Sequence, residues 1–162
     1  KTTGQAYDAD GALAASGWVD TQVVASFMQH PYFARPAPKS LDRDGFGDMA
    51  VLVAQLSAAD GAATLTAICV AAVAASLPLM PVQPKQMWIS GGGRKNREMM
   101  RQLAMKLPME VLDIDDIGLD GDMLEAQAFA YLAARVARGL PTSFPATTAA
   151  KAPLCGGKIN LP

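Results

Sequence analysis

Charged side chains are scarce in this sequence, and neither sign of charge dominates. Asp, Glu, Lys and Arg make up 18% of the 162 residues, and the formal net charge is −1. Nucleic acids and anionic membrane surfaces attract proteins through clustered positive charge, so the sequence predicts no nucleic-acid partner and no membrane partner. The hydrophobic fraction of 51% excludes a disordered chain and is enough to form the core of one ordinary domain.

Metal-binding patterns are lacking as well. Cys69 and Cys155 are the two cysteines, and they stand far apart with no Cys-x-x-Cys pattern. This supports neither a zinc site nor a disulfide scaffold. His30 is the single histidine, with no second histidine to share a metal ion. We therefore predict no metal site in the chain, and the sparse use of cysteine fits a reducing compartment, the cytoplasm.

Strongly apolar runs are also lacking, and residues 61–77 come closest to one. This stretch carries no charge, but alanine and threonine dilute it and Pro78 ends it, whereas a membrane-spanning helix needs about 20 strongly apolar residues. We expect a buried amphipathic helix here instead, with a start signal at Ser57 and Asp60. Its apolar face would carry Leu65, Ile68, Cys69, Ala72 and Val73.

The beginning of the sequence shows neither an initiating methionine nor a signal peptide, because Lys1 comes first and no apolar run follows it. We expect a fragment whose amino-terminal part is missing. Residues 1–46 predict a helical and loop-rich lead-in, with helices over Asp8–Ala15 and after Asp20. Three prolines predict that Pro31–Ser40 is an extended connector.

The second half of the sequence predicts alternating helices and strands. Gln86–Ser90 and Glu110–Asp115 are short apolar segments typical of strands, with helical patterns before, between and after them. The last of these helices is expected over Asp122–Arg138. A right-handed crossover makes such strands parallel, so the loops that follow them share one edge of the sheet. Open α/β sheets bind ligands at that edge, and the predicted fold class is a helix-rich α/β fold.

The first of the two loops contains three consecutive glycines, Gly91, Gly92 and Gly93. Because glycine has no side chain, backbone N–H groups there can approach a ligand closely. Asn96 can cap the following helix, whose N-terminus favours negative charge. The pattern therefore suits an anionic or nucleotide ligand. A tight connection that binds no ligand fits the same residues, and the sequence alone leaves both interpretations open.

The second loop, Asp116–Asp122, leads into the last predicted helix. Glu125 would lie in the first turn of that helix, where its carboxylate could face the ligand edge and bind a polyhydroxy substrate. Asp122 and Glu125 also have the spacing of a capping box, in which both side chains would bind only the backbone of the helix start. The basic run also has two interpretations, because its side chains could help to hold phosphates or could form a solvated face. It consists of Arg94, Lys95, Arg97 and Arg101.

These motifs, in this order, resemble the carboxyl-terminal half of the anhydro-N-acetylmuramic acid kinases. The match begins at the glycine turn with Asn96 and continues through Asp116-Ile117-Gly118, Asp122-x-x-Glu125-Ala126, Ala128-Phe129-Ala130 and Leu132-Ala133. It extends to both flanks through Tyr7-Asp8, Pro31-Tyr32-Phe33, Gly139-Leu140-Pro141 and Gly157-Lys158-Ile159, so it covers nearly the whole chain. The sequence departs from the usual family pattern at Leu41-Asp42, at Lys95 and at Ala149.

The resemblance implies the second, carboxyl-terminal lobe of an actin-like ATPase (ribonuclease H-like) fold, with residues 1–46 as lead-in and residues 47–162 as an α/β unit with a tail. Such kinases bind ATP and Mg²⁺ between two lobes. This family opens the 1,6-anhydro ring of anhydro-N-acetylmuramic acid with water and phosphorylates O6, giving N-acetylmuramic acid 6-phosphate in peptidoglycan recycling. Its catalytic base belongs to the missing amino-terminal lobe. We therefore expect no catalytic residue in this chain and no activity from it alone.

The resemblance also implies roles for particular residues. Nucleotide binding would fall to Gly91, Gly92, Gly93 and Asn96, and sugar binding to Glu125, with support from Asp122, Asp116 and Gly118. Two other functions remain open: the lobe of another actin-like sugar kinase, and a non-catalytic α/β module whose glycine turn is only a turn. An interface between two copies of the chain, a homodimer, could use Tyr32, Phe33 and Phe46.

Overall fold

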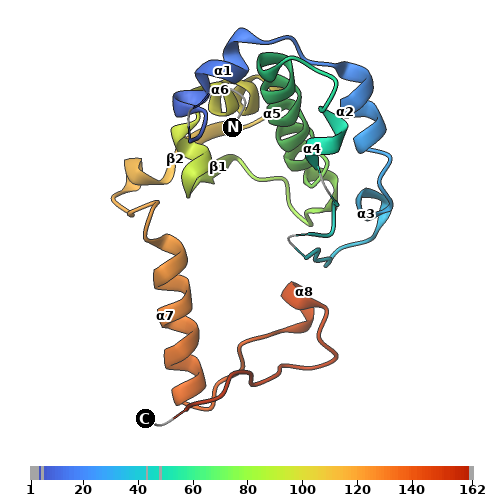
Figure 1. The fold of residues 1–162 in the computed structure, drawn as a ribbon. Coiled ribbons are helices and arrows are strands. Elements are labelled where there is room, and N and C mark those ends of the chain that lie inside the picture. Colours follow the sequence, from blue (N-terminus) through green and yellow to red (C-terminus); the bar gives the residue numbers. More distant parts are fainter. Residues whose placement is uncertain (1–3, 5, 43, 48, 161–162) are drawn as a thin grey trace.

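Two short parallel strands and the helix that connects them form the α/β unit of the fold (Figure 1). The computed structural model describes residues 4, 6–42, 44–47 and 49–160. Strands β1 (Gln86–Ile89) and β2 (Glu110–Asp113) pair in parallel, and helix α6 (Arg97–Lys106) connects them. The predicted helix-rich α/β fold with a parallel crossover is confirmed.

The longest helix, α5 (Ala58–Ala74), begins at the predicted start signal. The Ser57 side chain accepts a hydrogen bond from the Asp60 N–H group, 3.1 Å away, and its hydroxyl donates to the Asp60 carboxylate. That carboxylate also accepts a hydrogen bond of 2.7 Å from the Trp18 backbone N–H. The start of α5 is thereby joined to the lead-in, which precedes it by about forty residues in the sequence.

The buried residues of α5 differ from the predicted apolar face. Ile68 is buried as expected, but Leu65 is half-buried and Cys69 is exposed. The buried positions are spread around the helix because α1 (Ala12–Ser16), α2 (Thr21–Phe27) and α6 all pack against it. Small side chains permit this close packing on several sides: Gly61, Ala63, Thr64 and Thr66.

The main hydrophobic cluster joins α5 and α6 to the sheet. Val70, Leu77, Leu103 and Leu107 are its buried members, and partly buried residues from both strands pack against them. By length and composition alone, the stretch Ala58–Leu79 could cross a membrane. The cluster and the surrounding helices instead place α5 as the central helix of a folded core, as the sequence predicted for this segment.

Short elements complete the lead-in and the tail. They are η1 (Ala9–Gly11), α1 (Ala12–Ser16), α2 (Thr21–Phe27), α3 (Pro31–Ala34), α4 (Met49–Leu52), η2 (Leu77–Leu79), η3 (Gly92–Lys95), η4 (Ile114–Ile117) and α8 (Pro145–Thr148). Asp20 caps α2 as predicted, accepting hydrogen bonds from two backbone N–H groups in the first turn. Both η1 and α1 pack against α6, and α1 also packs against α5.

The sequence predicted an extended connector over Pro31–Ser40, and this prediction is wrong for its first turn. Its first four residues form α3, with Pro31 at the first helical position, where its fixed φ angle suits a helix start. Two aromatic rings of α3 pack against a later one: Phe46 lies 5.8 Å from Phe33 and 5.6 Å from Tyr32, measured between ring centroids. All three rings are half-buried. The homodimer that was predicted to use these rings stays a prediction.

Helix α7 (Leu124–Ala137) contributes no buried residue to the fold. It leads away from the other helices, and the tail turns back beside its far end, where Ser143 and Leu154 form an antiparallel bridge (Figure 1). Several large apolar side chains in this region are exposed, among them Phe129, Tyr131 and Ile159. Isolated helices of this length are marginal in water, so the way in which the start of α7 is held matters for its position.

A substitution at Ile68 tests the place of α5 in the core. Ile68 is 1% exposed, and Ile68→Ala should leave a cavity and lower the free energy of unfolding by about 2–5 kcal/mol. Ile159→Ala is the matched control, because this side chain is 63% exposed and its loss should change stability by less than about 0.5 kcal/mol. Urea unfolding followed by circular dichroism measures both. Equal losses would contradict the assignment of α5 to the core.

Candidate functional site

The two polar loops that follow the strands meet at one edge of the sheet. The Gly91 backbone N–H donates a hydrogen bond of 2.9 Å to the carbonyl oxygen of Gly121. Gly91 opens the loop after β1, and Gly121 lies in the loop that leads from β2 to α7. The expectation that both loops share the same edge is therefore confirmed.

A buried arginine holds the two loops together. The Arg94 side chain, 5% exposed, donates from Nε and Nη2 to the Asp115 carboxylate at 3.2 and 3.0 Å. Its Nη1 donates to Asp122 Oδ1 at 2.8 Å and to the Gly91 carbonyl oxygen at 3.0 Å. Asp113 Oδ1 lies 3.4 Å from Nε. Arg94 with Asp113, Asp115 and Asp122 is called the Arg94 clamp below.

The clamp lowers the pKa of two of its carboxyl groups, those of Asp122 and Asp115. Hydrogen bonds from Arg94 and then from Lys95, whose Nζ is 2.6 Å from Asp122 Oδ2, hold the pKa of Asp122 well below its ordinary value. The Gly121 N–H and then Arg94 lower the pKa of Asp115, and the carboxylates of Asp122 and Asp115 raise the pKa of Arg94. A lowered carboxyl pKa stabilises the fold above the ordinary value of 3.8 and loses that effect as the pH falls through the lowered value.

In the glycine turn, the backbone conformation requires a glycine at Gly91 but not at Gly92. Gly91 has φ +71° and ψ −167°, a conformation that side chains strongly disfavour. Gly92 has no such angle, and a Cβ atom there would meet nothing within 4 Å. Among the described residues, the N–H groups of Gly92 and Gly93 have no hydrogen-bond acceptor. The turn therefore presents two free backbone donors on an open surface, which suits an anion.

Asn96 caps α6 as predicted. Its Oδ1 accepts a hydrogen bond of 2.9 Å from the Met99 N–H group, and the helix begins at the next residue, Arg97. The helix N-terminus, with its partial positive charge, consequently lies immediately after the glycine turn. Both features favour the same kind of ligand.

The capping-box interpretation of Asp122 and Glu125 is wrong. The Asp122 carboxylate binds Arg94 and Lys95, and the Asp122 N–H donates to Asp120 Oδ1 at 2.9 Å. Helix α7 begins at Leu124, two residues later than predicted, and its N-cap residue Met123 provides no side-chain cap. The clamp holds Asp122 outside the helix, which explains the shift.

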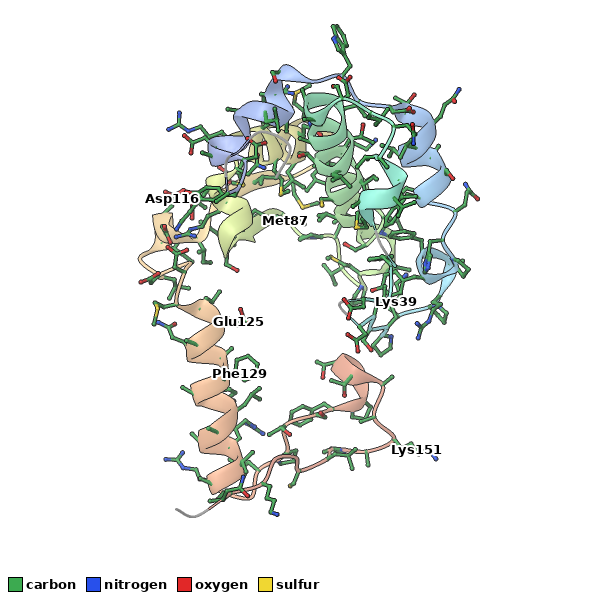
Figure 2. The ribbon with its side chains drawn as sticks, in the orientation of Figure 1. Lys39, Met87, Asp116, Glu125, Phe129 and Lys151 are labelled. Carbon is green, nitrogen blue, oxygen red and sulfur yellow. The ribbon has the colours of Figure 1, made fainter. Side chains whose placement is uncertain are left out.

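Glu125 is free of structural contacts within the described ranges. Its side chain is exposed and makes no hydrogen bond or ion pair with another described residue. Figure 2 shows Glu125 and Phe129 extending from the same side of α7, as residues four apart on a helix do. The carboxylate is therefore available to a ligand.

The other predicted supporting residues lie in the second loop. Asp116 is exposed in η4, close to the end of the sheet (Figure 2). Gly118 ends η4 with φ +78°, a left-handed conformation that favours glycine. Within residues 4, 6–42, 44–47 and 49–160, no group of three or more His, Cys, Asp or Glu side chains could hold a metal ion.

The basic run divides into paired and unpaired residues. Arg94 and Lys95 bind the acidic loop, and Arg101 binds Glu98 at 2.6 Å. The hydrogen bond from Arg101 is the main cause that lowers the pKa of Glu98 to about 2. Arg97 is exposed and forms no ion pair in the part of the chain that the structure describes. Since the Arg94 donors are used inside the fold, Arg94 organises the loops and is not open to a phosphate.

Comparison with known proteins gives the family. Residues 1–161 match the family model described as anhydro-N-acetylmuramic acid kinase. The chain belongs to this family. Curated relatives with the same name include those of Ruegeria sp. (strain TM1040), 50% identical, and Roseobacter denitrificans (strain ATCC 33942 / OCh 114), 52% identical, each over 159 residues. A relative from Cereibacter sphaeroides is 53% identical.

The chain spans less than half the length of these kinases. The alignments cover 98% of this chain but only 42% of the Ruegeria and Roseobacter proteins and 43% of the Cereibacter protein. Membership of the anhydro-N-acetylmuramic acid kinase family confirms the resemblance drawn from the glycine turn and the Asp122-x-x-Glu125 motif. The binding roles of individual residues stay predictions.

Two site residues escaped the sequence reasoning, Arg94 as a clamp and Gly121 as its packing partner. A Cβ atom on Gly121 would lie 2.6 Å from Arg94 Nε and 2.8 Å from Ile114 Cγ2, so glycine is needed there. A signal was present in the sequence. The second loop carries several aspartates, and such a cluster needs a cation, which the basic residue directly after the glycines could supply.

Two glycine substitutions distinguish packing from ligand access. Gly121→Ala should crowd Arg94 and lower the free energy of unfolding by about 1–3 kcal/mol, as overpacking does. Gly92→Ala should change it by less than about 0.5 kcal/mol, because the added methyl group meets no atom of the described chain. Urea unfolding of both variants checks this. A loss for Gly92→Ala as large as that for Gly121→Ala would contradict the open face of the turn.

Proposed function

We propose that this chain is part of an ATP-dependent kinase that opens anhydro-N-acetylmuramic acid and phosphorylates O6, giving N-acetylmuramic acid 6-phosphate. One observation carries the proposal. In a chain of the anhydro-N-acetylmuramic acid kinase family, a glycine turn with two free N–H groups is joined directly to the loop that leads to the unbonded Glu125. Two binding elements of different chemistry thus lie at one sheet edge.

The glycine turn is the nucleotide-binding element in this proposal. The N–H groups of Gly92 and Gly93 fit phosphate oxygens, and the missing side chains let the nucleotide approach the backbone. Asn96 caps helix α6, and the partial positive charge at the N-terminus of that helix attracts the same phosphate groups. Mg²⁺ would arrive with ATP, where it neutralises charge on the phosphates. We assign no described residue as a ligand of that ion.

Glu125 is the sugar-binding element. A free carboxylate accepts hydrogen bonds from sugar hydroxyl groups, and charge-assisted bonds of this kind are stronger than neutral ones. Asp122 supports it by fixing the loop three residues before it. Asp116 and Gly118 support it less directly, by shaping the same loop.

The complete enzyme would have two lobes in an actin-like ATPase fold, of which this chain is the carboxyl-terminal one. The part of the complete enzyme that corresponds to the rest of the relatives' sequences would supply the catalytic base and the other wall of the cleft. Phosphoryl transfer depends on holding ATP, metal ion and acceptor together. The chain alone should therefore show no turnover. We place the enzyme in the cytoplasm, in peptidoglycan recycling.

The test is made in the full-length protein. Glu125→Gln should lower kcat/KM for anhydro-N-acetylmuramic acid by about 10- to 100-fold, the range expected for weakening one charged hydrogen bond. Formation of ADP in the presence of the sugar measures this. The thermal stability should stay unchanged, because Glu125 caps nothing.

Two results would contradict the proposal. Full activity in Glu125→Gln would remove its role at the sugar. If the wild-type enzyme acted equally well on a sugar without the anhydro bridge, it would be another sugar kinase. Glu110→Gln is the control, since Glu110 is an exposed carboxylate at the opposite end of β2, bound to Gln86.

A further inference from the structure

The attachment of α7 depends on the residues that precede it. No residue of the helix is buried, so packing along its length fixes its direction only weakly. The segment before it is firmly held: Asp115 Oδ1 accepts from the Gly121 N–H at 2.8 Å, and the Gly121 carbonyl accepts from Gly91. Asp122 then binds both Arg94 and Lys95. The start of α7 is thus anchored to the glycine turn.

One nitrogen atom of Arg94 touches both loops. Nη1 donates to the Gly91 carbonyl oxygen at 3.0 Å and to Asp122 Oδ1 at 2.8 Å. Gly91 belongs to the turn that would bind the nucleotide, and Asp122 lies three residues before Glu125, less than one helical turn away. A displacement of the turn therefore reaches the helix start through this guanidinium group, beside the Gly91–Gly121 hydrogen bond and the Lys95–Asp122 ion pair.

Charge makes this connection hard to replace. Asp113, Asp115 and Asp122 all lie within 3.4 Å of the Arg94 side chain. Without it, three carboxylates would repel each other at the sheet edge, and Lys95, which is 60% exposed, contacts only Asp122 among them. A lysine at position 94 would provide a single ammonium group, which lacks the planar fork of arginine.

We propose that Arg94 is a positioning residue that couples the two ligands: a nucleotide on the glycine turn fixes, through the Arg94 clamp, the position of Glu125 for the sugar. This inference rests on the proposed function, because it takes the ligands from there. By linkage, each ligand then raises the affinity for the other by the same factor.

The experiment measures that factor in the full-length protein. Calorimetry gives the affinity for a non-hydrolysable ATP analogue with Mg²⁺, with and without saturating anhydro-N-acetylmuramic acid. In the wild type, the sugar should strengthen nucleotide binding by about 5-fold or more. In Arg94→Ala the factor should fall toward 1, and Arg94→Lys should not restore it. Arg97→Ala, which removes the same charge from an exposed position, should keep the wild-type factor.

The outcomes separate this inference from the proposed function. A wild-type protein that binds both ligands without coupling, or an Arg94→Ala variant that keeps the coupling, would overturn the role of Arg94 and leave the kinase proposal standing. A wild-type protein that binds neither ligand would overturn the proposed function and this inference with it. If Arg94→Ala does not fold, Asp122→Asn takes its place, because it weakens the same connection at the other end.

A measurement on the chain without ligands supplies an independent check. Hydrogen exchange of the Gly91 and Gly121 amides should become faster in Arg94→Ala and stay unchanged in Arg97→Ala, because only the first variant releases the two loops. Equal exchange in both variants would overturn the inference at its structural step.

Discussion

The site at the sheet edge depends on one buried guanidinium group shared by two loops. Arg94 belongs to the loop after β1. Of its partners, Asp113 is the last residue of β2, and Asp115 and Asp122 lie in the segment that follows it. Parallel pairing of the strands brings the loops to one edge, but it does not fix their separation. The ion pairs and the hydrogen bond from Gly91 to Gly121 do so. Because the strands are only four residues long, these contacts carry much of the local order.

In this arrangement, both the glycine turn and Glu125 at the start of α7 stay open to ligands. The N–H groups of Gly92 and Gly93 have no acceptor among the described residues, and the buried Arg94 side chain, which has no acceptor atom, leaves them uncovered. Glu125 stays free because Asp122 is held by the clamp and cannot form a capping box with it. The ion pairs that hold the two loops thus leave the N–H donors of the turn and the Glu125 carboxylate free to bind a ligand.

Hydrophobic periodicity and the helix start and stop signals in the sequence predicted most of the local structure. The strands, the crossover helix and the caps formed by Asp20, Ser57 and Asn96 follow from contacts between residues close in sequence. The buried face of α5 was predicted less well, because three helices pack around it and the pattern assumed one core-facing side. The first turn of the connector was missed since Pro31 can begin a helix as well as break one.

The clamp could not be predicted from either loop alone. Arg94 and Asp122 are 28 positions apart, and the charge run and the capping-box spacing each had a sufficient local explanation. Only the parallel pairing of the strands brings Arg94 and Asp122 together. Their contact then excludes a solvated face for Arg94 and a capping box for Asp122.

A pH titration of the Asp122 carboxyl group in this chain, followed by ¹³C NMR, tests the clamp most directly. The pKa should lie well below the ordinary value of 3.8, and it should move back toward that value in Arg94→Ala because the largest cause of the shift is gone. A pKa at or above the ordinary value in the wild-type chain, or no change in the variant, would contradict the clamp.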